Sequence, residues 1–175
     1  MEQELENGPM SQSEWKINVG SGDKDLQKQG FINLDMRRLP KTDLQASAAS
    51  LPFGSLTVDS ILASDCLEHI PWSYVPSVLL EWHRVLKHGG VLKIKTPNLR
   101  TLAEDYVNGK LNMSEYCRRV YGNQEAGEDA NFHKSGQSPD TIQVILMNAG
   151  FEIEQIHPAL DGGDHYNMGV RARAK

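Results

Sequence analysis

The chain has 175 residues, of which 39% are hydrophobic, enough for one compact domain with a buried core. Its 18 basic residues are scattered and outnumbered by 23 acidic ones, so the net charge of -5 excludes a general affinity for nucleic acid. Cys66 and Cys117 lack the spacing of a zinc site or a disulfide framework, and we expect no metal ion. Because no apolar segment approaches about 18 residues, we predict a cytoplasmic protein that does not contact a membrane.

Residues 1–13 are polar and acidic, which is typical of a flexible tail. We predict a single domain over residues 14–175. Short runs rich in β-branched and aromatic residues predict its strands. These runs are residues 15–20, 30–35, 55–64, 89–97, 151–158 and 167–174.

Apolar residues recur at three- and four-residue spacing between Val75 and Leu86, which predicts a helix over residues 73–90 that ends at Gly89 and Gly90. Pro76 should lie in its first turn, with Glu81 and His83 on its exposed face. A second clear helix begins after Ser138 with Pro139 at its first position and ends at Gly150. Further helices are expected at residues 98–110 and 113–122, and a loop at residues 123–136.

Strands that alternate with helices indicate crossover connections, and therefore a mostly parallel sheet with both faces covered. The last two strands are separated by too few residues for a helix, so they should form a hairpin that adds an antiparallel strand. We predict an α/β fold with a Rossmann-like, doubly wound, mostly parallel sheet and an antiparallel C-terminal strand.

Ligands of such a sheet bind outside the carboxyl ends of its strands. Gly20 and Gly22 follow the first predicted strand, where they would let a ligand approach main-chain N–H groups. Asp35 ends the second strand, where its carboxylate can accept hydrogen bonds from a ribose diol. Its neighbour Met36 can cover one face of a base.

Residues around the third predicted strand complete a nucleoside-shaped site. Ser47 and Ala48 precede that strand and can contact the edge of an adenine, while Ser64 and Asp65 follow it. A dinucleotide fingerprint would need a third glycine where Asp25 stands, so a ligand with a ribose and no pyrophosphate fits better.

Three segments in this order resemble the class I S-adenosylmethionine-dependent methyltransferases, from Trp15 onward. They are INVGSGD with GFINLD, SLPFGSLTVDSILASDCLEHI, and LLEWHRVLKHGGVLKIKTPNL. The chain is particularly similar to a small bacterial branch, like methyltransferase type 11, whose genes often lie near those for cell-surface polysaccharides. The resemblance implies the class I methyltransferase fold, S-adenosyl-L-methionine as cofactor, and methyl transfer to a small-molecule acceptor.

The resemblance also implies roles for the cofactor-binding residues. Gly20, Ser21 and Gly22 would line the methionine part, Asp35 would hold the ribose hydroxyls, Met36, Ser47 and Ala48 would surround adenine, and Ser64 and Asp65 would approach the methionine amino group or the sulfonium. The chain departs from the family pattern at three positions. Asn18, which is also counted among the cofactor-binding residues, stands where many relatives have an acid, Lys24 replaces a frequent glycine, and Ser47 replaces the usual aspartate near adenine.

Methyl transfer from a sulfonium needs alignment and exclusion of water more than a nucleophile from the protein. A hydroxyl acceptor would benefit from a general base. His133 is the first candidate because it lies in the loop before the last helix; Asp65 is the second and His165 the third. His69 is interpreted as a structural histidine, and Cys66 as a small buried residue.

Two alternatives from other classes remain. One is an NAD-dependent oxidoreductase. The other is a non-catalytic S-adenosylmethionine-binding module, suggested by a short chain with little room for an acceptor-binding insertion. No feature indicates a nucleic-acid or protein acceptor, so a small molecule is expected, with a sugar or polysaccharide precursor implied by the resemblance. The sequence does not indicate the oligomeric state.

Overall fold

The computed structural model describes residues 14–124, 129–159 and 165–175; the predicted tail lies outside them. The described residues form one seven-stranded sheet in the order β3-β2-β1-β4-β5-β7-β6. All neighbouring strands are parallel except that β7 runs antiparallel to both β5 and β6. The mostly parallel sheet with an antiparallel C-terminal strand is therefore confirmed.

The strands are β1 (Lys16–Val19), β2 (Phe31–Asp35), β3 (Leu44–Gln45), β4 (Val58–Ser64), β5 (Leu86–Pro97), β6 (Phe151–His157) and β7 (Asn167–Ala174). The helices are α1 (Val75–Val85), α2 (Leu99–Val107), α3 (Met113–Tyr121) and α4 (Pro139–Asn148). Single 3-10 turns lie at Gln27–Gln29, Leu67–His69 and Asp129–Asn131. None of the helices in the described part of the chain has the length and apolarity needed to cross a membrane.

The end of α1 differs from the prediction. The helix ends at Val85 and β5 begins at the next residue, so Gly89 and Gly90 lie within the strand instead of stopping the helix. The cause is tertiary: the N–H groups of Leu56 and Thr57 donate to the carbonyls of Arg84 and Val85, at 2.9 Å each, where the helix would otherwise continue.

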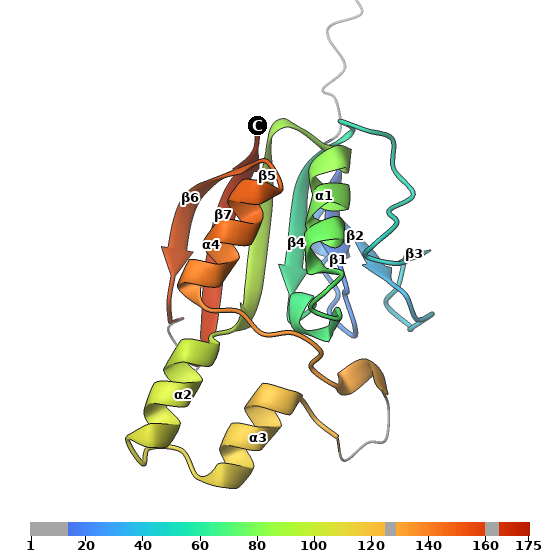
Figure 1. Ribbon diagram of the computed structural model, residues 1–175. Coiled ribbons are helices and arrows are strands. Elements are labelled where there is room, and N and C mark those ends of the chain that lie inside the picture. The colour runs from blue at the N-terminus through green and yellow to red at the C-terminus, as the bar shows by residue number, and fades with distance from the viewer. Residues whose placement is uncertain (1–13, 125–128, 160–164) are drawn as a thin grey trace, which may run out of the picture.

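Helices α1 and α4 lie side by side over one face of the sheet, while α2 and α3 lie beyond its carboxyl edge (Figure 1). The alternation of strands and helices in the sequence predicts helices on both faces. In the described residues, the connections that precede β2 and β4 contain only a 3-10 turn and loops. The strand residues on the second face are accordingly polar or partly exposed, such as Ser60 and Lys93.

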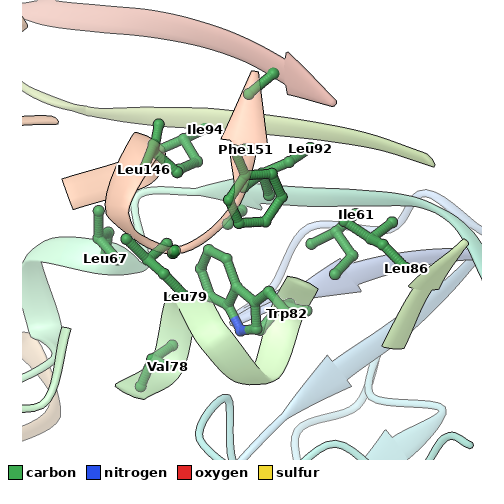
Figure 2. Close-up of a cluster of buried hydrophobic side chains, with 14 of the residues drawn as sticks. Ile61, Leu67, Val78, Leu79, Trp82, Leu86, Leu92, Ile94, Leu146 and Phe151 are labelled. Carbon is green, nitrogen blue, oxygen red and sulfur yellow. The ribbon is translucent and has the colours of Figure 1, made fainter. Parts of the chain in front are cut away.

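The core fills the space between the sheet and the pair α1 and α4, with Trp82 and Phe151 at its centre (Figure 2). Both rings are almost fully buried and are surrounded by aliphatic side chains. The Trp82 indole Nε1–H donates to the carbonyl of Ala48 at 2.9 Å. The core therefore also fixes the segment that precedes β4, which contains two of the predicted adenine contacts.

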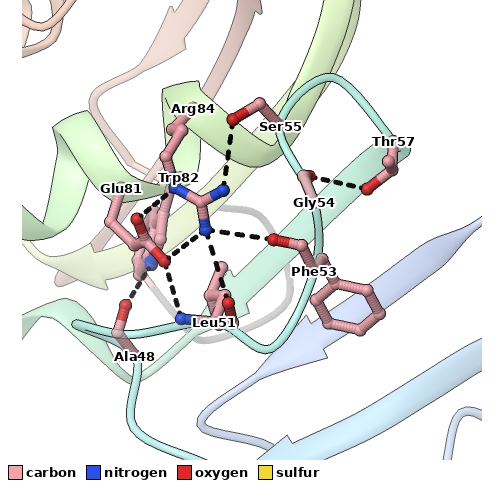
Figure 3. Close-up of polar contacts among 9 residues, drawn as sticks. All are labelled: Ala48, Leu51, Phe53, Gly54, Ser55, Thr57, Glu81, Trp82 and Arg84. Atoms are coloured by element: carbon pink, nitrogen blue, oxygen red, sulfur yellow. Dashed lines mark hydrogen bonds and ion pairs between the residues drawn. The ribbon is translucent and has the colours of Figure 1, made fainter.

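A polar network attaches the same segment to the outer side of α1 (Figure 3). Glu81 accepts the N–H of Leu51 at 2.7 Å and pairs with Arg84. Arg84 in turn donates to the carbonyl of Phe53 at 3.1 Å. The prediction that Glu81 and His83 are simply exposed is wrong: both are half-buried, and the His83 ring packs edge-on against Phe151 at 5.2 Å.

Removing the Glu81 carboxylate should destabilise the protein. Glu81→Ala leaves the Leu51 N–H without its acceptor, so we expect the free energy of unfolding to fall by about 1–3 kcal/mol in urea titrations. Glu104→Ala, an exposed glutamate of α2, is the matched control and should change it by less than about 0.5 kcal/mol. Equal losses in the two variants would contradict this role of Glu81.

Candidate active site

The turn after β1 explains why two glycines stand one residue apart. Gly20 and Gly22 have φ angles of +64° and +54°, in the left-handed region that favours glycine. A Cβ on Gly20 would lie 2.5 Å from the Cys66 Sγ, whereas a Cβ on Gly22 would meet nothing within 4 Å. Gly20 therefore allows close packing on Cys66, and Gly22 borders open space. Burial raises the pKa of the Cys66 thiol to about 12, so this cysteine is no nucleophile.

Asp35, at the end of β2, is bonded directly to this turn. Its Oδ2 accepts the Gly22 N–H at 2.9 Å, and its Oδ1 accepts the Arg37 N–H at 2.9 Å and the Arg37 Nε–H at 3.2 Å. Burial alone would raise the pKa of Asp35, but the two N–H groups and the Arg37 guanidinium outweigh it and hold the pKa below its ordinary value. The turn and an ionised carboxylate thus form one cradle.

Two further polar side chains, those of Ser21 and Asn18, belong to the predicted cofactor site. The Ser21 hydroxyl is buried and has no hydrogen-bond partner in the described part of the protein. The Asn18 side chain, by contrast, lies within the sheet, where its Nδ2 donates to the Asn33 Oδ1 at 3.0 Å. The structure therefore brings Ser21 to the turn but keeps the Asn18 amide away from it.

The predicted adenine contacts follow the short strand β3, which pairs with the end of β2. The Ala46 N–H donates to the carbonyl of Asp35 at 3.0 Å, and this bond places Ser47 and Ala48 near the cradle. The Ser47 hydroxyl accepts the Ala49 N–H at 3.2 Å, so it is already used in a local turn. Met36 is 70% exposed beside them.

Lys24 stands where relatives frequently have a glycine, and it connects the turn after β1 to the end of β4. The Lys24 Nζ donates to the Ser64 Oγ at 2.9 Å and to the Asp65 Oδ2 at 2.7 Å. Lys95 lies 3.8 Å from the other Asp65 oxygen. Asp65 has a φ of +55°, a conformation that non-glycine residues rarely adopt and that clusters at functional sites.

A cavity of about 180 Å³ opens beside Asp65. Its walls come from the 3-10 turn after β4, the end of β5, α2, α3, the loop before α4 and the start of β7. The lining residues are Asp65, Glu68, His69, Pro97, Leu102, Arg119, His133, Tyr166 and Asn167.

Helices α2 and α3 close this cavity. They form an insertion of the acceptor-binding kind, for which the short chain was expected to leave little room. Tyr106 of α2 and Tyr116 of α3 stack with their ring centroids 4.7 Å apart. The Arg119 guanidinium lies 4.2 Å over the ring of Tyr166, the residue just before β7. A small apolar cluster that includes Leu102 and Tyr166 fixes the two helices against the sheet edge.

His133, the first predicted general base, lines the cavity together with two residues that were not predicted there. The His133 and His69 rings meet edge to face at 5.0 Å, and burial lowers the pKa of both. Burial and the charge of Asp65 raise the pKa of the neighbouring Glu68 to about 7. His165 instead contacts Asp105 at 3.2 Å and does not line the cavity.

Glu68 and His69 both lie in the segment CLEHI, in which His69 was interpreted as a structural histidine and Glu68 was given no role. Arg119 lies on a predicted helix and carried no signal of its own. Only the folded chain shows that these residues share a cavity with His133.

Comparisons with known proteins bear on the family and the fold. Residues 24–94 match the family described as "Methyltransferase domain". No curated protein matches the sequence.

Several solved structures have a similar fold. A methyltransferase from Methanosarcina mazei is 16% identical with a TM-score of 0.65, and the alignment covers 93% of each chain. One from Mesorhizobium loti is 16% identical with a TM-score of 0.66, over 92% of this chain and 91% of that one.

A third similar structure contains ligands. It is the 1,6-didemethyltoxoflavin-N1-methyltransferase of Burkholderia thailandensis with its acceptor and S-adenosylhomocysteine bound. It is 15% identical with a TM-score of 0.65, over 91% of this chain and 70% of that one. The match of residues 24–94 to the methyltransferase family and the fold shared with S-adenosylmethionine-dependent methyltransferases both support the resemblance to class I methyltransferases found in the sequence.

Proposed function

We propose that the protein binds S-adenosylmethionine in the cradle of Gly20–Gly22 and Asp35 and transfers its methyl group to a small acceptor in the cavity beside Asp65. The observation that supports this most is the ionised Asp35 carboxylate, which is bonded to the open Gly22 turn at the carboxyl edge of the sheet. Cradle and cavity lie at the same edge, as a transfer between two bound molecules requires.

The cradle residues fit the chemistry of this cofactor. The Asp35 oxygens retain acceptor capacity for a ribose diol, and the unpartnered Ser21 hydroxyl offers a polar contact to the methionine part. Met36, Ser47 and Ala48 would border the adenine. When bound, the cofactor supplies a methyl group that is already activated, so the protein contributes orientation and the exclusion of water.

The cavity suits a small acceptor, or the reacting end of a larger one. Its volume of about 180 Å³ is that of a few water molecules. The Arg119 Nε is buried without a partner in the described residues, so an acceptor with a carboxylate or phosphate would complete its hydrogen bonds. A sugar or polysaccharide precursor carrying such a group has this chemistry. The acceptor of the Burkholderia enzyme is also a small molecule.

His133 is the proposed general base for a hydroxyl acceptor. It lines the cavity, and because burial and the nearby His69 lower its pKa, the imidazole is neutral near pH 7 and able to take a proton. Asp65 is the second candidate, although Lys24 and Lys95 already hold its carboxylate. The free thiols of Cys66 and Cys117 are compatible with the proposed cytoplasmic location.

The α2 and α3 insertion favours a catalytic protein over a mere cofactor-binding module, because it encloses a cavity for a second molecule. An NAD-dependent oxidoreductase stays less favoured, since Asp25 stands where the dinucleotide fingerprint needs its third glycine.

A thermal-shift panel with S-adenosylmethionine, S-adenosylhomocysteine, NAD and NADP separates these functions. We expect the first two ligands to stabilise the protein, by about 2.7 kcal/mol at a hundred times the dissociation constant, and the nicotinamide cofactors to have no effect. Mass spectrometry of acceptor mixtures should then detect a product heavier by one methyl group. Stabilisation by NAD alone would contradict the proposal.

A further inference from the structure

We propose that Glu68, His69 and His133 form a binding site for a divalent transition-metal ion such as Zn²⁺ in the wall of the cavity. One potential ligand atom from each of these residues lies within 4.8 Å of the other two. The cysteine spacing predicts no metal ion, and His133 is far along the chain from the other two residues, so the sequence gives no sign of this site.

The hydrogen bonds of the two histidines prepare them as ligands. The His69 Nδ1 lies 3.1 Å from the carbonyl of Phe132, and the His133 Nδ1 lies 3.0 Å from the carbonyl of Arg119. A carbonyl can only accept, so each Nδ1 carries the proton and each Nε2 keeps its lone pair. Metal-binding histidines commonly donate their other ring N–H to a carbonyl or carboxylate in this way.

Glu68 offers a buried carboxyl group that no basic side chain of the described residues contacts in an ion pair. It is 2% exposed, and its Oε2 accepts the Thr96 hydroxyl at 3.0 Å. The nearby ammonium groups of Lys24 and Lys95 are directed to Asp65 instead. Because an unpaired buried carboxylate is costly, a cation between Glu68 and the imidazoles would stabilise this arrangement.

Positive charge nearby opposes the ion. Arg119 lines the same cavity, and Lys134 follows His133. The Arg119 guanidinium is stacked on Tyr166.

A main-chain hydrogen bond holds the three residues together. The N–H of Lys134 donates to the carbonyl of Glu68 at 2.7 Å, which connects the loop that carries His133 to the turn that carries Glu68 and His69.

Two imidazoles and one carboxylate suit Zn²⁺, Mn²⁺, Fe²⁺ or Co²⁺ better than Mg²⁺, which prefers oxygen ligands. With bonds of about 2.0–2.2 Å and tetrahedral geometry, two ligand atoms of one Zn²⁺ ion lie about 3.3–3.6 Å apart, so the side chains must close by up to about 1.5 Å around it. Three protein ligands leave a position open for an acceptor heteroatom. That catalytic use depends on the proposed function; the binding of the ion does not. With the ion bound, the His133 Nε2 lone pair is used as a ligand, so the general base for a hydroxyl acceptor would then be the second candidate, Asp65.

Calorimetric titration of the chelator-treated full chain with ZnCl₂, without S-adenosylmethionine, tests the site. We expect one ion per chain, and at least about tenfold weaker binding in His133→Ala and in Glu68→Gln, because even the loss of an outer partner of a metal ligand costs about 10–100-fold. His88→Ala, which removes an exposed histidine outside the cavity, should bind as the unaltered protein does. Absence of binding in the unaltered protein, or equal affinity in all three variants, would overturn the site.

A second measurement avoids substitutions that could disturb folding. In ¹⁵N NMR spectra of the unaltered protein, Zn²⁺ should shift the Nε2 signals of His69 and His133 and leave those of His88 unchanged. Shifts confined to other histidines would reject the site. The metal site and the proposed function can fail separately. If the protein binds Zn²⁺ but is not stabilised by S-adenosylmethionine, only the proposed function is contradicted. If S-adenosylmethionine stabilises the protein but Zn²⁺ does not bind, only the metal site is contradicted.

Discussion

Replacing Asp35 with alanine is expected to weaken the binding of S-adenosylmethionine and S-adenosylhomocysteine at least about 100-fold. The carboxylate would accept two charge-assisted hydrogen bonds from the ribose, each contributing about 1.5–3 kcal/mol. Two such bonds at the lower limit correspond to about two orders of magnitude in affinity. Isothermal titration calorimetry of the two proteins measures this difference directly.

The same substitution also releases the Gly22 turn, so a matched control is needed. Asp59 lies near the amino-terminal end of β4, at the opposite edge of the sheet, and likewise accepts a main-chain N–H, from Trp15 at 2.8 Å, and pairs with Lys87 at 2.7 Å. Asp59→Ala should therefore lower stability as Asp35→Ala does but leave cofactor affinity unchanged. If Asp59→Ala weakened binding as strongly, the loss of affinity in Asp35→Ala would be explained by lower stability alone.

The low pKa of Asp35 has a consequence for acid stability. A carboxyl group whose pKa is lower in the folded state than in the unfolded state stabilises the protein above the unfolded value of about 3.8. This contribution is lost as the pH falls through the folded-state pKa. Urea titrations should show that Asp35→Asn is less stable than the unaltered protein at pH 7 and that the deficit shrinks below about pH 3.8. A deficit that is independent of pH would mean that Asp35 acts only through packing.

The second large effect is expected at Gly20. A methyl group there would approach the Cys66 Sγ to 2.5 Å and its Cβ to 2.8 Å in a backbone with a φ of +64°. Overpacking costs about 1–3 kcal/mol and the left-handed backbone about 1–2 kcal/mol more, so Gly20→Ala should lower the free energy of unfolding by about 2–5 kcal/mol.

Gly22→Ala provides the comparison for this prediction. A Cβ at Gly22 meets no atom within 4 Å, so only the backbone cost of about 1–2 kcal/mol applies. The new methyl group would, however, project into the space proposed for the cofactor. We expect a smaller loss of stability than in Gly20→Ala, together with a clear loss of S-adenosylmethionine affinity in calorimetry. Equal losses of stability in both variants would show that the Cys66 side chain moves away from the added methyl group at little cost.

Local chain chemistry was sufficient to predict several elements. The start of α4 follows from Ser138 as N-cap with Pro139 behind it, and its end precedes Gly150, whose φ is +92°. The closeness of the glycine turn and Asp35 was also predictable, because the carboxyl ends of neighbouring parallel strands meet at one edge.

Other elements depend on contacts between distant segments. The end of α1 is determined by the N–H groups of Leu56 and Thr57, which reach it from another part of the chain. Glu81 looks like an exposed helix residue until the segment around Leu51 packs against α1. In the part of the chain that the structure describes, one face of the sheet lacks the helices that strand alternation suggests, because the connections before β2 and β4 contain no α-helix.

By itself, the sequence determined the α/β class, the order of its main elements, the glycine turn with its acidic partner, and the family resemblance, because these depend on local composition, spacing and the geometry of a parallel sheet. The tertiary structure alone decided which side chains face the cavity. Glu68 and His69 meet His133 only because a loop distant in sequence is bonded to the turn after β4 and because main-chain carbonyls orient both imidazoles. Contacts between residues that are distant in sequence produce no periodic pattern along the chain, so the sequence alone does not predict them.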